Sequence, residues 1–112
     1  MQPKIHLFLC DDTGERFFGE GPYRLLLLIG QTGSLRSAAL EMGMAYTKAL
    51  KIIQRAEANL GYSLTERKTG GKGGGGSCLS DQAKELINQY EIYKTRCHEA
   101  NLRIFSECFP EQ

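Results

Sequence analysis

The chain has 112 residues, of which 41% are hydrophobic and 24% charged, and its formal net charge is +1. This size and balance predict one globular domain with a single hydrophobic core, and they exclude a disordered tail. No apolar run approaches the roughly 20 residues that cross a bilayer. The first residues lack the basic and apolar stretches of a secretory signal, so we expect a cytoplasmic protein.

The first predicted elements are a hairpin and a helix. Apolar and polar residues alternate over 4–10, which predicts a strand, and the Asp11–Gly14 turn followed by Arg16–Phe18 predicts a short returning strand. Pro22 then stands in the first turn of a helix that runs to about Gln31. Four apolar residues of this helix are expected in the core: Leu25, Leu26, Leu28 and Ile29.

Two further helices are predicted to cross at a glycine turn. Ser34 is a favourable N-cap for a helix over about 35–42. Gly43 fits the tight turn that follows, because glycine adopts positive φ without strain. The next helix, over about 45–60, ends before Gly61. Its core-facing residues fall at helical spacing: Ala49, Ile52, Ile53, Ala56 and Leu60. Small residues around a glycine turn are typical of a helix-turn-helix, although an ordinary helical hairpin is an alternative.

A glycine-rich loop between two strands follows. Residues 62–67 are predicted to form a strand, and Cys78–Leu79 the strand that returns. The loop over 69–77 contains six glycines and one lysine. It is not a nucleotide-binding P-loop, because Lys72 is followed by glycine rather than by Ser or Thr. A flexible linker is one alternative, but the flanking strands favour a wing hairpin whose backbone N–H groups face phosphates.

The last element is predicted to be a long amphipathic helix. Ser80 is its N-cap, and Asp81 lies in the first turn, where the helix dipole favours negative charge. Apolar residues alternate at gaps of four and three, as in a coiled coil: Leu79, Ala83, Leu86, Tyr90, Tyr93, Cys97, Ala100 and Ile104. A helix of about 28 residues is about 40 Å long, more than this small domain covers. We therefore expect residues 83–104 to form a homodimer interface.

Charge is concentrated in the middle of the chain. Residues 36–72 carry seven Lys or Arg against three Asp or Glu, while the segments before and after are slightly acidic. The helix over 45–60 is expected to lie in the major groove of DNA, with Thr47 and Lys51 contacting bases, while Arg67 and Lys72 contact phosphates. The complete set of expected DNA contacts is Ser34, Arg36, Tyr46, Thr47, Lys48, Lys51, Arg55, Arg67, Lys68, Gly71, Lys72 and Gly73.

Cysteine and histidine indicate neither a metal site nor an enzyme. Cys10, Cys78, Cys97 and Cys108 are scattered without a CxxC pair, which predicts buried reduced thiols. A metal site at Cys97, His98 and Cys108 is an alternative, but adjacent helical residues point about 100° apart. His6 and His98 have no nucleophile or acid partner in view, so we expect no catalytic residues, metal or cofactor.

Three segments resemble the molybdate-responsive ModE family, a relative of the LysR-type regulators. The segment from Gly33 reads GSLRSAALEMGMAY, the segment from Leu60 reads LGYSLTER, and the segment from Thr69 reads TGGKGGGG. The last of these is similar to the ModE wing, and the whole resemblance covers about 4–107. It implies a mainly α fold with small β elements (α+β), with a winged helix-turn-helix over 1–79 and a dimerisation helix over 80–109. Ala45 replaces the usual Ser, and Leu50 replaces the usual Trp, so the preferred operator is expected to differ.

The sequence thus predicts a homodimeric, sequence-specific DNA-binding regulator of transcription, with molybdenum-related genes as possible targets. The molybdate-binding C-terminal domains of full-length ModE have no counterpart in these 112 residues, so we expect no molybdate response in the purified chain. The alternative is an interaction module that dimerises with a separate sensor protein.

Overall fold

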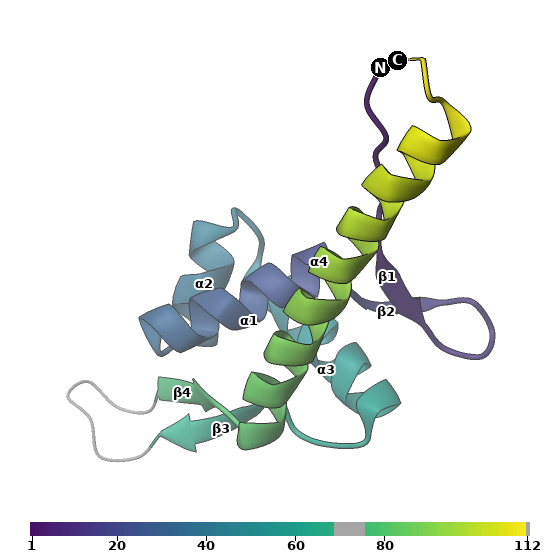
Figure 1. The fold of residues 1–112 in the computed structure, drawn as a ribbon. Coiled ribbons are helices and arrows are strands. Elements are labelled where there is room, and N and C mark those ends of the chain that lie inside the picture. Colours follow the sequence, from purple (N-terminus) through teal and green to yellow (C-terminus); the bar gives the residue numbers. More distant parts are fainter. Residues whose placement is uncertain (69–75, 112) are drawn as a thin grey trace.

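The structure is a computed structural model that describes residues 1–68 and 76–111. These residues form a winged helix-turn-helix with four helices and two antiparallel hairpins (Figure 1). In chain order the elements are β1 (Phe8–Cys10), β2 (Arg16–Gly19), α1 (Glu20–Thr32), α2 (Leu35–Glu41), α3 (Tyr46–Leu60), β3 (Thr65–Lys68), β4 (Gly76–Leu79) and α4 (Asp81–Cys108). The prediction of a mainly α fold with small β elements is confirmed.

Helices α1, α2 and α3 pack around one apolar core. Leu25, Leu26 and Ile29 of α1 are fully buried, and Leu28 is partly buried and packs against the same core. Ala38 and Ala39 of α2 are also buried, and their small side chains allow α2 to lie close to its neighbours. Gly43 has a φ of 69° in the turn between α2 and α3. The predicted glycine turn is therefore confirmed. It sets the direction of α3 relative to α2.

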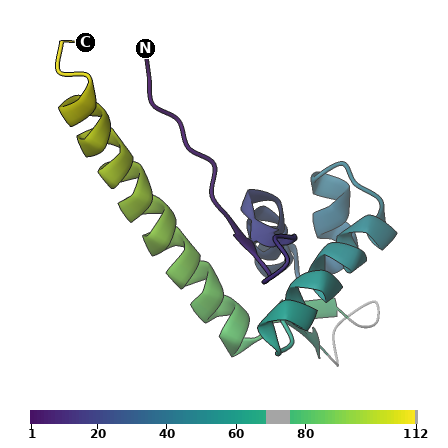
Figure 2. The ribbon, with the colours of Figure 1, turned by 90° about the vertical axis from the view of Figure 1, so that its right-hand side faces the viewer.

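The N-terminal strand is shorter than predicted. Only Phe8–Cys10 pairs with β2, and a bulge between Leu9 and Cys10 interrupts the register. Residues 4–7 keep the expected alternation of exposure, but the short β2 offers them no backbone partner. They instead run beside α4 (Figure 2), where the Tyr90 hydroxyl approaches the Leu7 carbonyl at 3.4 Å.

The wing strands dock against the end of α1. Strands β3 and β4 pair in register from Thr65 opposite Leu79 to Lys68 opposite Gly76, so β3 begins later than the predicted residue 62. The Ser77 amide donates to the Gly33 carbonyl at 2.8 Å. A Cβ at Gly76 would lie 2.7 Å from that carbonyl oxygen, so only glycine allows this close approach.

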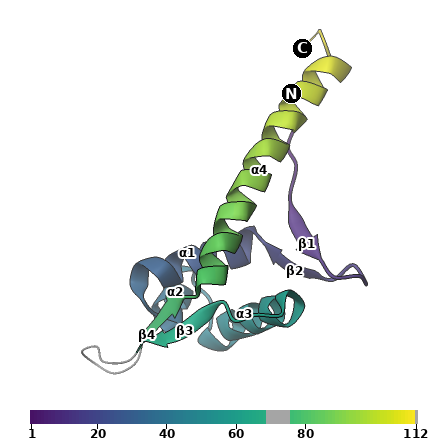
Figure 3. The same ribbon diagram turned by 60° about the horizontal axis from the view of Figure 1, so that its bottom comes forward.

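Helix α4 has a buried half and a projecting half. Ser80 caps it by accepting a hydrogen bond from the Ala83 amide at 3.0 Å, as predicted. Near its start, Tyr90 packs edge-on against Phe18 and tilted against Tyr23. Its C-terminal half extends away from the domain (Figure 3), which stretches the molecule to 60 × 29 × 25 Å. Within the described ranges, no helix is both long and apolar enough to cross a membrane.

Candidate nucleic-acid interface

Helix α3 presents a cationic face that the core leaves exposed. Ala49, Ile53 and Ala56 anchor the opposite face of the helix, with at most 3% of each side chain exposed. The expected contact residues all lie on the exposed side of the helix: Tyr46, Thr47, Lys48, Lys51 and Arg55. Leu50 of the same helix is partly buried. This face combines positive charge with hydroxyl groups, the chemistry that contacts phosphates and base edges.

The start of α3 is linked to α2 by a cation–π contact. The Arg36 guanidinium lies 4.5 Å from the centre of the Tyr46 ring, which joins two of the expected contact residues into one surface. Ala45 precedes α3 without a side-chain cap, as its methyl group requires. Ser34 accepts from the Ser37 amide at 3.1 Å, so its side-chain oxygen caps α2.

Arg67 and Lys68 lie at the end of β3, beyond the core. Both are exposed, but neighbouring strand residues point to opposite faces, so the two side chains leave the wing in different directions. The approach to this strand is fixed by Glu57 of α3, whose carboxylate accepts from the Leu64 amide at 2.7 Å. The expected contacts Gly71, Lys72 and Gly73 lie outside the described residues.

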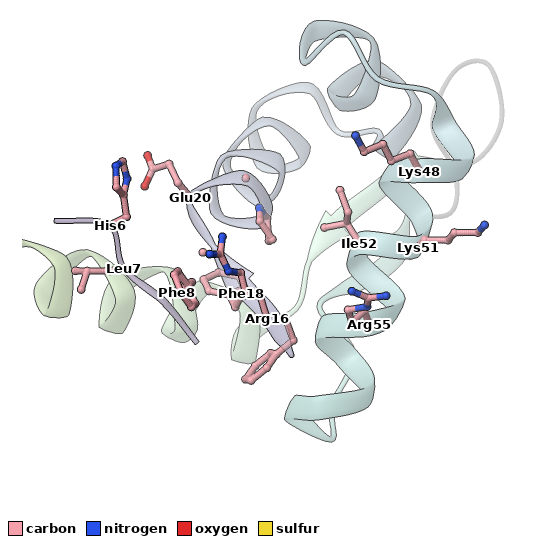
Figure 4. A pocket seen from close by; sticks show the side chains of 14 residues that line it. His6, Leu7, Phe8, Arg16, Phe18, Glu20, Lys48, Lys51, Ile52 and Arg55 are labelled. Carbon is pink, nitrogen blue, oxygen red and sulfur yellow. The ribbon is translucent and has the colours of Figure 1, made fainter. Parts of the chain in front are cut away.

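Beside α3 lies a cleft that the sequence did not reveal. Its volume is about 620 Å³, and its walls come from the β1–β2 hairpin, the first turn of α1, and α3. Figure 4 shows Lys48 and Ile52 on the side of α3 that faces α1 and the hairpin, whereas the charged end of Lys51 points the other way, although Lys51 also contributes to the lining. Arg16 on β2 faces the same cleft and was not singled out in the sequence. Only the fold brings Arg16 near residues more than 30 positions later in the chain.

The expected dimer seam is divided between two environments. Ala83, Leu86 and Tyr90 are buried in the core of this chain, with at most 6% exposure, and so are unavailable to a partner. The expected homodimer interface over residues 83–104 therefore does not hold for its first half, which aromatic and aliphatic residues of α1 and β2 cover; for the outer half it stays a prediction. Tyr93 and Ile104 are about half exposed, at 47% and 51%, and Cys97 and Ala100 are partly buried. A shallow groove along this outer half also includes Gln89, Ile92 and Arg96.

A buried tyrosine holds α1 against α4. The Tyr23 hydroxyl donates to the Glu91 carboxylate at 2.6 Å. Burial, followed by this hydrogen bond, raises the pKa of Tyr23 from 10.0 to about 12. Lys94 completes the contact, lying 4.6 Å from the centre of the Tyr23 ring and 3.2 Å from a Glu20 oxygen. These contacts fix the orientation of α4 relative to the helix-turn-helix.

The cysteine side chains are more exposed than predicted. Cys10 and Cys108 are exposed and Cys78 and Cys97 partly buried, so none of the four free cysteines is a core residue. Among the described side chains, no three His, Cys, Asp or Glu residues are grouped as metal ligands would be.

The chain matches known proteins in sequence. Residues 23–81 match the family described as bacterial regulatory helix-turn-helix protein, lysR family. The chain is 37% identical over 94 residues to the DNA-binding transcriptional dual regulator ModE of Escherichia coli (strain K12), covering 82% of this chain and 35% of that protein. It is 41% identical over 81 residues to the molybdenum transport protein ModE of Herbaspirillum seropedicae, covering 72% and 28% respectively. The chain thus spans about a third of the length of these curated relatives.

The fold also has a solved counterpart. The structure aligns with the protein chain in the crystal structure of a CbnR_DBD–DNA complex at a TM-score of 0.58 and 16% identity. The alignment covers 79% of this chain and 95% of that one. At this identity the likeness concerns the fold alone.

Proposed function

Because this chain belongs to the lysR family of bacterial regulatory helix-turn-helix proteins, we propose that it binds duplex DNA in a sequence-specific manner and regulates transcription. The observation that carries the proposal is the exposed face of α3, where Thr47, Lys48, Lys51 and Arg55 follow one another on a helix anchored by buried alanines. An ordinary core helix needs no such face.

In this proposal α3 enters the major groove. Lys51 points outward and donates to guanine O6 and N7, while Thr47 contacts a neighbouring base edge. Lys48 and Arg55 lie toward the flank of the helix, where they reach phosphates. The wing, with Arg67 and the glycine segment that includes Lys72, contacts the DNA backbone on the other side of α3.

We further propose that the protein acts as a homodimer through the projecting half of α4. Exposed apolar side chains on one helix favour burial against a second copy. Residues 93–104 carry the interface in place of the longer seam, because the first half of the helix is already covered. On this basis residues 1–79 form the DNA-binding unit, and residues 80–109 form the dimerisation helix.

The relatives suggest which genes are controlled. One is named a molybdenum transport protein, and a further relative, at 37% identity over 82 residues, is the molybdenum-pterin-binding protein MopB of Rhodobacter capsulatus, with 73% of this chain and 30% of that protein covered. We propose that this chain controls molybdenum-related genes. The second candidate, an interaction module for a separate sensor protein, is favoured only by the exposed groove on α4.

Selection of bound sequences from a random duplex pool, followed by fluorescence anisotropy, tests the proposal. Lys51→Ala should weaken binding to the selected duplex by about 1–3 kcal/mol and relax the preference at the base pair that Lys51 contacts, because a base contact is lost. Lys84→Ala is the control, because Lys84 is exposed on α4 away from the proposed interface. Equal losses in both variants, or no enriched sequence, would contradict DNA recognition by α3 and favour the interaction module.

A further inference from the structure

We propose that the cleft between the β1–β2 hairpin and α3 binds a small organic anion with an aromatic or otherwise apolar body. Such a ligand would occupy the flank of α3 and so compete with DNA. The competition rests on the proposed function, whereas the binding site itself does not. The proposal is carried by the shape of the cleft, its charge, and the way its walls are held.

The cleft has the size and lining of a small-molecule site. Its volume of about 620 Å³ lies within the range of about 300–1,000 Å³ found for ligand pockets. Most of its wall is apolar, formed by Leu7, Phe8, Phe17, Pro22 and Ile52. A hydrated inorganic ion gains nothing from such walls, whereas an organic ring buries its surface against them.

The charge of the cleft selects for an anion. Arg16 lies on the hairpin wall, and Lys48 and Arg55 lie on the α3 wall (Figure 4). Glu20 is the acidic residue of the lining, and Lys94 pairs with it at 3.2 Å. Four cations from two separate elements, Arg16, Lys48, Lys51 and Arg55, therefore line the cleft beside apolar surface, which suits a carboxylate or sulfonate attached to a ring.

The hairpin wall is held in place without a ligand. The Asp11 carboxylate accepts from the Thr13 hydroxyl at 2.6 Å and from the Thr13 and Glu15 amides, so the turn is fixed. These hydrogen bonds, that of the Thr13 side chain first, lower the pKa of Asp11. At the other end, Phe18 is only 2% exposed and anchors β2 in the core. The Arg16 guanidinium stacks on the Phe8 ring at 3.7 Å, which positions its charge at the cleft.

A ligand at this place would interfere with DNA because it shares a helix with the proposed interface. Lys48 contacts the cleft and is also a proposed phosphate contact. Lys51, the proposed base contact, also contributes to the lining. Neutralising Lys48 and filling the space beside Ile52 would reduce both the charge and the accessible width of the α3 face.

The test uses two probes with the same rings. The anionic probe is 8-anilinonaphthalene-1-sulfonate, and the neutral probe is N-phenyl-1-naphthylamine. Each is titrated into the ¹⁵N-labelled 112-residue chain while amide shifts are recorded. We expect the sulfonate to shift the amides of Phe8, Arg16, Lys48 and Ile52 and to bind about tenfold more tightly than the neutral probe. Shifts confined to the exposed face of α4 around Ile92, or equal affinities of the two probes, would overturn the proposal.

Two variants identify the site. Arg16→Glu should weaken sulfonate binding about tenfold or more, since a convergent cation becomes a repelling charge. Lys84→Glu makes the same change in net charge far from the cleft and should have little effect. Ile52→Trp should fill the cleft and abolish binding of both probes without changing the charge. Unchanged sulfonate affinity in both cleft variants would overturn the assignment.

A separate arm tests the competition with DNA. Saturating sulfonate should release a fluorescent duplex from the wild-type chain but not from Ile52→Trp, provided that the variant binds the duplex. Sulfonate that fills the cleft while the duplex stays bound would overturn the competition alone. If the chain binds no DNA, the proposed function fails, while the amide shifts still decide the binding site. If DNA shifts the cleft amides and the sulfonate does not, the cleft is a DNA-backbone groove and the proposal is wrong.

Discussion

Ser80 lies buried between β4 and α4, where its hydroxyl makes two hydrogen bonds. It donates to the Ser63 carbonyl at 2.6 Å and accepts from the Ala83 amide at 3.0 Å. The Ser80 amide also donates to the Leu64 carbonyl at 3.0 Å. One side chain therefore caps the long helix and ties it to the segment that leads into the wing.

Ser80→Ala should lower the free energy of unfolding by about 2 kcal/mol, because the cap is lost and the Ser63 carbonyl loses its partner. Urea unfolding followed by circular dichroism measures the change. Ser106→Ala, at an exposed position on the same helix, is the control and should change stability by less than about 0.5 kcal/mol. Equal effects at the two positions would mean that Ser80 acts only through helix propensity.

The contribution of Tyr23 to the free energy of unfolding decreases at alkaline pH. Its pKa in the folded chain is about 12, against 10.0 for a free tyrosine. The unfolded chain therefore loses this proton first, and the contribution of Tyr23 is complete below about pH 10 and is lost as the pH rises toward about 12.

Tyr23→Phe should cost about 1 kcal/mol at neutral pH, because the hydrogen bond to Glu91 is lost. It should also make stability fall less steeply between about pH 10 and about pH 12, by the linkage argument. Urea midpoints across this range measure both effects. Tyr93→Phe, at a site 47% exposed, is the control at neutral pH and should cost less stability than Tyr23→Phe. A slope in Tyr23→Phe as steep as that of the wild type would contradict the assignment.

At the scale of elements, α4 serves two purposes along its length. Its first turns contribute Ala83, Leu86, Ile87 and Tyr90 to the core, whereas later apolar residues remain exposed. Substitutions in the two halves should therefore have different consequences.

Leu86→Glu should destabilise the fold by about 3 kcal/mol or more, since it places a charge where only 6% of the side chain is exposed. Tyr93→Glu should leave the fold intact and, if α4 forms the dimer, give monomers. Circular dichroism measures folding, and light scattering coupled to size-exclusion chromatography measures mass. A wild-type chain that is monomeric at tens of micromolar concentration would exclude the dimer, whatever the variants do.

The ends of helices and the turns could be predicted from the sequence where neighbouring residues determine them. Ser34 and Ser80 cap their helices, and Gly43 takes the positive φ that its turn requires. Sequence-based prediction was wrong where the structure depends on contacts between residues far apart in the chain. Residues 4–7 alternate like a strand but lack a pairing edge, and the heptad spacing of α4 does not distinguish burial in the same chain from burial in a partner. The cleft was missed because its walls, the hairpin and α3, meet only in the folded chain.

For the whole molecule, the distribution of charge and cavities bears on which anions it can sense. A selective oxyanion site needs several converging N–H and hydroxyl donors and little water. The cleft beside α3 is open and largely apolar, so it cannot distinguish molybdate from sulfate. We therefore expect this 112-residue chain to bind DNA equally well with and without molybdate.

Titration calorimetry with molybdate, using sulfate as the control, checks this expectation. Neither anion should give a saturable heat at micromolar concentration, and anisotropy of a bound duplex should respond to both only through ionic strength. Selective micromolar binding of molybdate would contradict it and would indicate an oxyanion site within these 112 residues.

The direct connection between the wing and α4 gives the molecule mechanical leverage. Strand β4 ends at Leu79 and α4 begins at Asp81, so Ser80 is the only residue between them, and its four hydrogen bonds leave little freedom. A helix of 28 residues is about 42 Å long, so a tilt of about 5° about Ser80 moves its far end by about 4 Å. The same rotation moves the far end of a four-residue wing strand by about 1 Å. A rigid rotation about Ser80 would therefore move the tip of α4 about three times as far as the far end of β4, and the contacts of Tyr23, Glu91 and Lys94 resist that rotation.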